Sequence, residues 1–312
     1  MEPFGRVLFV PSVPDSEWAA ALIADRAPLE LPVAGRRFVD YAVEHARRCG
    51  ASDVEILDWR YSESVASGFA GEDWTGGRTV YRKGEGPMPR GLDGLAASSG
   101  LFPHGVEEGL AVVWGLCLFG HVPGEINLVP ATPAECEETP AGLYRFVGGR
   151  WMRACPHGTT MRRVKAWHMA NFVVLGNPGA FTLPCYSAES RVYLGRNVVI
   201  EHGTEVKPPV LLNSNTWFAR NVTLEGDVIV GSGSFVGEGA RLRRTLVGDD
   251  TYVGAGLELK EKIVIGNRIV DAESGAYMDV EEPGVARSIP AGFGWMRTVW
   301  RFLRGRSCGR TG

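Results

Sequence analysis

Few side chains in this 312-residue sequence have the type and spacing that catalysis or metal binding requires. The six cysteines are scattered without a C-x-x-C pair or any other paired spacing, which argues against a disulfide framework and against a structural zinc site. His202 is a candidate general base, because a neutral imidazole accepts a proton near pH 7. A structural role for this histidine at a turn is the alternative.

Positively charged side chains gather between residues 139 and 188, a stretch without any acidic residue. They are Arg145, Arg150, Arg153, His157, Arg162, Arg163, Lys165 and His168. The segment could bind a phosphorylated sugar, a lipid phosphate or an acidic partner, and a solvated surface is the alternative. The whole chain has a formal net charge of -3 and a pI near 6.1. It therefore lacks the basic field that drives phosphate-backbone binding, and nucleic acid is not an expected partner.

A six-residue period organises the second half of the chain. Apolar residues recur at Leu194, Ile200, Val206, Leu212, Phe218, Leu224, Val230, Val236 and Leu242, and after a one-residue slip at Val247, Val253, Leu259 and Ile265. Turn residues recur beside them at Gly195, Gly231, Gly237, Gly248, Gly254 and Gly266 and at Asn197, Asn215, Asn221, Asp227 and Asp249. We expect the turn glycines and asparagines to adopt positive φ.

This period predicts a left-handed parallel β-helix over residues 186–281, with three short strands per coil and the repeat side chain pointing inward. A sandwich or barrel would instead show period-two alternation over strands of uneven length. The flat outer faces of such a solenoid can stack against another chain, so we expect a homo-oligomer.

Residues 1–185 have the pattern of an α/β domain. A buried-strand pattern at Gly5–Val10 ends at a proline, apolar residues at helical spacing predict a helix over Phe38–Arg48, and Asp53–Leu57 is a second strand pattern. Strand, helix and strand in that order predict a parallel sheet. The continuous apolar run Ala111–Phe119 predicts a further strand, buried on both faces.

Residues 31–41, 186–198 and 207–210, together with the order of the two domains, resemble the sugar-1-phosphate nucleotidyltransferases, a family that includes NDP-sugar synthases and pyrophosphorylases. Residues 31–41, LPVAGRRFVDY, resemble the segment after the glycine-rich loop of that family. Residues 186–198 and 207–210 resemble the start of its β-helix. The resemblance implies a Rossmann-like nucleotidyltransferase domain before the β-helix and a role in nucleotide-sugar or cell-surface polysaccharide metabolism.

The residues that would hold the nucleotide in this family are replaced here. Its glycine-rich loop corresponds to residues 11–18, PSVPDSEW, so Ser12 and Asp15 stand among the degenerate positions. Two prolines remove amide donors, and the acidic side chains repel phosphate. The lysine of the family falls on Pro28, and nearby Arg26 could replace its charge only.

The metal-binding residues of the family are also missing. Its first aspartate falls on Leu116, which would deprive magnesium of a protein ligand. Its second aspartate has no counterpart, because no acidic residue lies between Glu138 and Glu189. A retained sugar or nucleotide pocket would be lined by Arg26, Gly91, Asp93, Gly94 and Trp114, although a core role is the alternative for the tryptophan.

Nucleotidyl transfer depends mainly on positioning and on charge neutralisation. The joint loss of loop, lysine and aspartates therefore predicts a pseudoenzyme without a cofactor, which acts as a scaffold, a regulator or a nucleotide-sugar sensor. An active nucleotidyltransferase with rebuilt ligands, which would need magnesium, is one alternative. An acyltransferase that uses His202 is another, but the repeats lack the long inserted loop that usually shapes an acyl-donor site.

Residues 282–312 form a basic tail. At about 100° per residue, the apolar side chains of residues 295–304 fall on one side of a helix and the arginines on the other. The expected membrane or partner contacts are Trp295, Arg297, Trp300, Arg301, Phe302 and Arg304. Packing on a β-helix of the same or a sister chain is the alternative. Since no apolar run is as long as a signal peptide or a membrane span, we expect a cytoplasmic protein, peripheral at the inner membrane face if the tail binds lipid.

Overall fold

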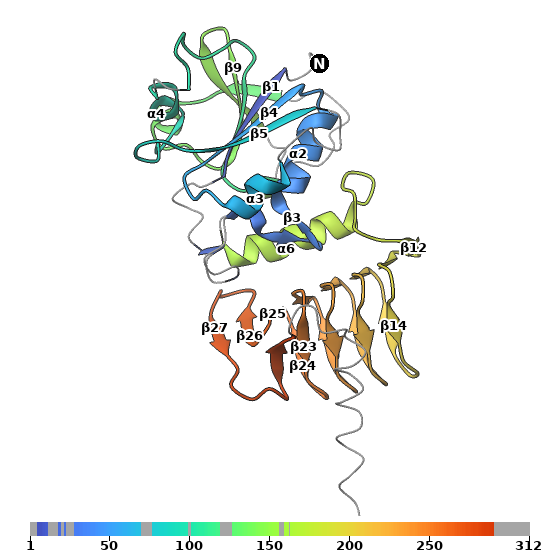
Figure 1. The fold of residues 1–312 in the computed structure, drawn as a ribbon. Coiled ribbons are helices and arrows are strands. Elements are labelled where there is room, and N and C mark those ends of the chain that lie inside the picture. The colour runs from blue at the N-terminus through green and yellow to red at the C-terminus, as the bar shows by residue number, and fades with distance from the viewer. Residues whose placement is uncertain are drawn as a thin grey trace, which may run out of the picture. The chain divides into compact units, whose positions relative to one another are not determined.

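The computed structural model divides into two compact units, Met1–Thr182 and Leu183–Gly312, called here the N-terminal and C-terminal units (Figure 1). Each unit is described by itself. The structure describes residues 5–11, 18–19, 22, 28–69, 77–98, 101–118, 127–155, 159–161 and 163–289. It is a mixed α/β structure in which several sheets contain parallel strands.

The N-terminal unit is built on a seven-stranded sheet with the order β5-β4-β1-β6-β9-β10-β8. Its strands are β1 (Arg6–Val10), β4 (Asp53–Asp58), β5 (Arg78–Lys83), β6 (Ala111–Trp114), β8 (Asn127–Pro130), β9 (Gly142–Val147) and β10 (Arg150–Cys155). Strands β5, β4, β1 and β6 pair in parallel with one another, whereas the pairs β6–β9, β9–β10 and β10–β8 are antiparallel. The predicted strand, helix and strand at the start of the chain are confirmed.

The helices of this unit are α2 (Phe38–Arg48), α3 (Glu63–Gly68), α4 (Leu92–Ala96), α5 (Pro133–Glu137) and α6 (Val164–Gly176), with a 3-10 turn η2 at Pro28–Glu30. Small two-stranded sheets pair β2 (Pro32–Val33) with β3 (Arg36–Arg37) and β7 (Cys117–Leu118) with β11 (Thr159–Thr160). Helix α2 has the predicted bounds, because its apolar residues bury one side of the helix.

The predicted single strand Ala111–Phe119 is wrong in one respect. Strand β6 ends at Trp114, and Gly115 then adopts a φ of 73°, a conformation that continues no strand. Leu116 follows, and Cys117–Leu118 pairs in a different sheet. The sequence does not reveal this break in the strand, because the residues on both sides of it are apolar and buried.

The C-terminal unit contains three sheets that the chain visits in rotation. The eight-stranded sheet contains β12 (Ser187–Glu189), β13 (Val192–Leu194), β16 (Val210–Leu212), β19 (Val228–Val230), β22 (Leu246–Val247), β25 (Lys262–Ile265), β26 (Arg268–Asp271) and β27 (Tyr277–Asp279). The five-stranded sheet contains β14 (Val199–Ile200), β17 (Trp217–Phe218), β20 (Phe235–Val236), β23 (Thr251–Val253) and β28 (Ala286–Ser288). The four-stranded sheet contains β15 (Glu205–Lys207), β18 (Thr223–Glu225), β21 (Arg241–Arg243) and β24 (Glu258–Lys260).

Each round of three strands pairs in parallel with the next round. Val210 pairs with Val228, 18 residues on, whereas Val230 pairs with Val247, 17 residues on. Strands β12, β26, β27 and β28 are antiparallel additions at the ends of these sheets.

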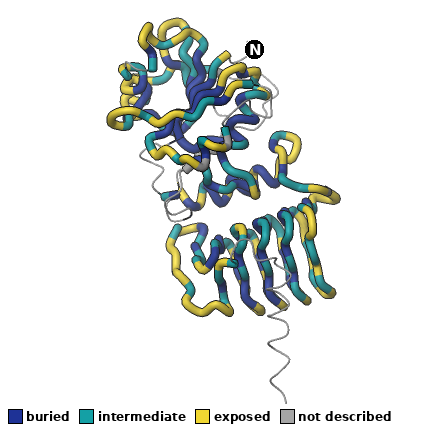
Figure 2. Tube along the Cα trace, in the orientation of Figure 1, coloured by how far each residue is buried: buried dark blue, intermediate teal, exposed yellow. Residues whose placement is uncertain are grey.

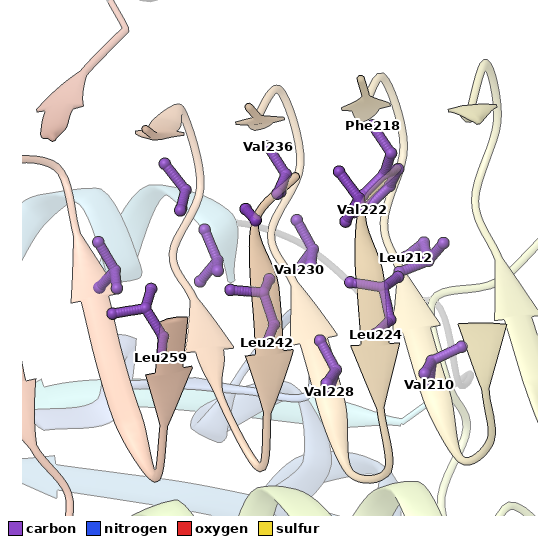
Figure 3. Close-up of a cluster of buried hydrophobic side chains, with 14 of the residues drawn as sticks. Val210, Leu212, Phe218, Val222, Leu224, Val228, Val230, Val236, Leu242 and Leu259 are labelled. Atoms are coloured by element: carbon purple, nitrogen blue, oxygen red, sulfur yellow. The ribbon is translucent and has the colours of Figure 1, made fainter. Parts of the chain in front are cut away.

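One hydrophobic cluster runs through the rounds. Figure 3 shows its side chains from successive strands directed toward one another. The repeat residues Leu212, Phe218, Leu224, Val230, Val236, Leu242, Val247, Val253 and Leu259 belong to the buried cluster. Buried stretches recur along the stacked strands in Figure 2. The predicted inward position is thus confirmed for these nine residues.

The ends of the repeat series differ from the prediction. Ile200 is 41% exposed. At the other end, Val264 and not Ile265 pairs with Val247 and lies in the cluster. The interval from Leu259 to Val264 is five residues, like the earlier interval from Leu242 to Val247. In both places the corner between two strands is one residue short, at Arg244 in the first and at Glu261, with a φ of 54°, in the second.

The turn glycines follow two different rules. Positive φ is confirmed for Asn197, Asn215, Asn221, Asp227 and Gly266, and the aspartate that adopts it in the later turn is Asp250 rather than Asp249. The expectation was wrong for Gly195, Gly231, Gly237, Gly248 and Gly254, which lie outside the positive-φ set. Close approach explains four of them: a Cβ on Gly195, Gly231, Gly237 or Gly254 would lie within 2.5 Å of a backbone atom of a later segment.

Candidate functional site

The carboxyl edge of the seven-stranded sheet is the candidate site. The chain runs from β1 to β4 and β5 on one side and then returns to β6 on the other, so the strand order reverses between β1 and β6. Ligands of open α/β sheets bind outside the carboxyl ends of the strands at such a reversal. Pro11 and Gly115 directly follow the two strands there.

The described residues that directly follow β1 and β6 are Pro11 and residues 115–118, and none of them is charged. The amide of Gly115 donates to the Val10 carbonyl at 2.8 Å, which closes the backbone between the two strands. Leu116 follows and is 1% exposed, and its carbonyl accepts from the amide of buried Met161. Cys117 and Leu118 are buried as well. A leucine side chain offers neither charge nor lone pairs, so it cannot coordinate a hard cation.

No group of three or more metal-ligating side chains occurs among the described residues.

One carboxylate does lie at this edge, at the end of β4, and sequence reasoning missed it. Asp58 is fully buried and accepts from the Tyr81 hydroxyl at 3.0 Å and from the Arg60 amide at 2.9 Å. The pKa of Tyr81 is raised, mainly by burial of its hydroxyl and secondly by the charge of the Asp58 carboxylate. Internal donors occupy both oxygens of Asp58, so this group braces the loop after β4. An aspartate that ends a buried strand was the signal available in the sequence.

The segment that carries the family resemblance is a tight hairpin held by α6. Its turn residues Ala34 and Gly35 have φ values of 45° and 77°, the combination of a type I′ turn. The Ala34 amide donates to Asn171 Oδ1 at 2.7 Å, and Trp167 Nε1 donates to the Pro32 carbonyl at 2.8 Å. The hairpin is thus a fixed support rather than a loose loop.

A buried ion cluster fixes α2 beside this hairpin. Glu44 accepts from Arg36 at 2.7 Å, from Arg48 at 2.5 Å and from the Thr182 hydroxyl. Burial pushes the pKa of Glu44 upward, but the hydrogen bonds from Thr182 and Arg36 and the charges of the two arginines outweigh it, so the pKa is lowered.

The structure describes four of the five predicted pocket residues. Gly91 precedes α4, where a Cβ would lie 2.3 Å from the Cys136 carbonyl oxygen. Asp93 and Gly94 are exposed on α4. Trp114 is 1% exposed within the core cluster that also holds Trp151, so its role is packing.

Two members of the cationic segment pair or pack within the N-terminal unit. Arg153 pairs with Glu135 at 2.6 Å, and His168 is buried against Phe172 in α6. His202 lies exposed at the turn between β14 and β15, and its carbonyl accepts from the Asn221 amide. The rounds on both sides of His202 keep their 18-residue spacing, so no inserted loop accompanies it.

Several predicted positions lie outside the described residues. They are Ser12, Asp15 and Arg26, His157 and Arg162 of the cationic segment, and the tail residues Trp295, Arg297, Trp300, Arg301, Phe302 and Arg304. Pro28 is the first residue of η2. Within the described part, no helix is both long enough and apolar enough to cross a bilayer.

Comparisons with known proteins give no family. No family model matches the chain, and no curated protein matches it.

Proposed function

We propose that the N-terminal unit is a sugar nucleotidyltransferase-like domain that has lost nucleotidyl transfer and acts as a nucleotide-sugar sensor or scaffold in nucleotide-sugar or cell-surface polysaccharide metabolism. The observation that carries this proposal is Leu116, a buried leucine at the carboxyl edge where the strand order reverses. Phosphoryl chemistry at that edge requires a metal or cationic side chains. Among the described residues that directly follow β1 and β6, none offers a carboxylate for a metal or a cationic side chain.

The order of the parallel strands supports the choice of domain. With β5, β4, β1 and β6 as third, second, first and fourth strands, the sheet follows the order of a dinucleotide-binding half. The hairpin at Pro32–Arg37 places the family-like LPVAGRR segment against α6. We take the three sheets of the C-terminal unit as the faces of a left-handed parallel β-helix, since rounds of 17 or 18 residues fit three six-residue repeats.

The test is pyrophosphate release from a panel of nucleoside triphosphates and sugar-1-phosphates with magnesium, beside thermal shifts of the same protein. No turnover together with stabilisation by a nucleotide sugar is the expected sensor result. Turnover would refute the loss of activity. If the protein shows neither turnover nor a thermal shift, the sensor role is refuted and the scaffold role remains.

A pair of matched variants locates the binding site if a shift is found. Asp93→Ala removes a carboxylate from the predicted pocket segment, and Glu85→Ala removes one from another exposed position of the same unit. We expect the first to change the ligand-induced shift and the second to leave it unchanged. Equal ligand-induced thermal shifts in both variants would show that the pocket does not lie at α4.

A further inference from the structure

The five-stranded sheet of the C-terminal unit carries a row of neighbouring aromatic side chains. Phe218, Val236 and Val253 of its strands belong to the core cluster, so the alternate residues Trp217, Phe235 and Tyr252 point away from the core. Register pairs these three in adjacent strands. The ring centroids lie 6.4 Å and 5.5 Å apart, and all three side chains are half-buried. We call them the aromatic ladder.

The other two sheets offer different outward rows. The corresponding row of the eight-stranded sheet is apolar but buried, at Tyr193, Leu211, Ile229, Leu246 and Ile263. The four-stranded sheet carries charged side chains that pair across strands, such as Lys207 with Glu225 and Arg241 with Glu258. Among the described rounds, the aromatic ladder is therefore the partly exposed apolar row.

The ring geometry favours an apolar protein segment over a sugar. Phe235 and Tyr252 stack with their planes 17° apart, and the Arg287 guanidinium lies 5.1 Å from the Tyr252 ring centroid. Phe235 and Tyr252 turn their ring faces toward each other, whereas a sugar ring stacks on an open face. Aromatic side chains such as tryptophan and phenylalanine pack well against ring edges.

The chain itself supplies such a segment at this sheet. Strand β28 pairs with β23 so that Arg287 lies opposite Tyr252, and the Ile289 amide donates to the Asp250 carbonyl at 2.6 Å. The described chain thus ends on the five-stranded sheet, beside the ladder. Residues 290–312 follow it directly.

The lengths agree with docking on this sheet. The linker 290–294 contains a proline and two glycines and could reach about 17 Å when extended. A helix over 295–304 would be about 15 Å long, and the ladder spans about 10 Å across two strand spacings. Its apolar residues Trp295, Trp300 and Phe302 would contact the ladder, while the arginines of its other side would stay in water.

We propose that residues 295–304 form an amphipathic helix that packs its apolar side on the aromatic ladder of the same chain. The proposal does not depend on the loss of nucleotidyl transfer.

The test is hydrogen exchange of the full-length protein, read by mass spectrometry on peptides from residues 295–304. We expect amides of this segment to exchange at least about tenfold more slowly than in the variant Trp300→Asp, equally at low and high protein concentration. Phe235→Asp should abolish the protection as well. Thr223→Asp, which adds the same carboxylate to the four-stranded sheet, should leave it intact.

Each other occupant gives a distinct result that would overturn the proposal. Protection that rises with concentration, together with a larger mass in sedimentation, would assign the ladder to a second copy. Protection that appears only with vesicles of phosphatidylglycerol would assign the tail to a membrane. Fast exchange of residues 295–304 under all conditions would mean that the ladder binds no part of this tail. If Phe235→Asp fails to fold, Trp300→Asp still decides, since it leaves the sheet unchanged.

Discussion

Leu116 shows how one side chain can decide the chemistry of an edge. Its position after β6 and Gly115 is where an open α/β sheet presents ligand-binding groups, yet it is packed as a core residue. A carboxylate placed there would lose its hydration without gaining a partner, which is costly. Restoring an acidic residue by mutation therefore restores no metal site.

We expect Leu116→Asp to lower the free energy of unfolding at pH 7 by about 3 kcal/mol or more. Burial raises the pKa of such a carboxyl, so part of this loss should disappear as the pH falls and the group becomes neutral. Urea unfolding between pH 4 and 7 measures it. Leu116→Asn, which has a similar shape and no charge, should lack that pH dependence. Recovery of Leu116→Asp stability on addition of magnesium would contradict these expectations.

Gly237 and Gly239 illustrate two different reasons for glycine in the C-terminal unit, close approach of backbone and positive φ. A Cβ on Gly237 would lie 2.5 Å from the Ala255 amide nitrogen, whereas Gly239 has open space but a φ of 71°. We expect Gly237→Ala to cost about 3 kcal/mol, because backbone must move, and Gly239→Ala about 1 kcal/mol for left-handed backbone. Chemical denaturation of the two variants compares them. An equal loss would mean that stacking distance does not constrain Gly237.

At the scale of elements, regular patterns were predictable and their interruptions were not. The helix at Phe38–Arg48 and the inward repeat residues followed from periodicity alone. The break after β6 did not, because Gly115 lies between residues that are buried on either side. The bracing of β4 by Asp58 and Tyr81 depends on residues 23 apart, and such a pairing is fixed only once the strands are aligned.

Helix α2 should be a pH-dependent element through Glu44. The lowered pKa of Glu44 in the folded state means that its ion cluster stabilises the protein above the ordinary glutamate value of 4.5 and that this contribution is lost as the pH falls through the lower folded pKa. We expect Glu44→Gln to cost about 1–2 kcal/mol at pH 7, as loss of charged hydrogen bonds does, and the difference from wild type to shrink below pH 4.5. Thermal unfolding against pH measures it, with Glu63→Gln on α3 as control. A difference that is constant with pH would show that the Glu44 charge is not involved.

At the scale of the whole molecule, the two units have separate hydrophobic clusters. The cluster around Trp114 and Tyr144 contains residues of the N-terminal unit only, and the cluster around Phe218 and Val230 contains residues of the C-terminal unit only. Rounds that contact mainly their neighbours gain stability from each shared boundary. Damage to one round should therefore spread along the C-terminal unit before it affects the seven-stranded sheet.

Val230→Ala tests this independence. The substitution removes two methyl groups from a fully buried side chain and should cost about 2 kcal/mol. In hydrogen exchange of the intact chain, we expect faster exchange in β16, β19 and β22, which share the eight-stranded sheet, and unchanged exchange in β1 and β6. Val112→Ala in β6 is the reciprocal control and should deprotect the seven-stranded sheet alone. If either substitution accelerates exchange equally in both units, the molecule unfolds as one cooperative body.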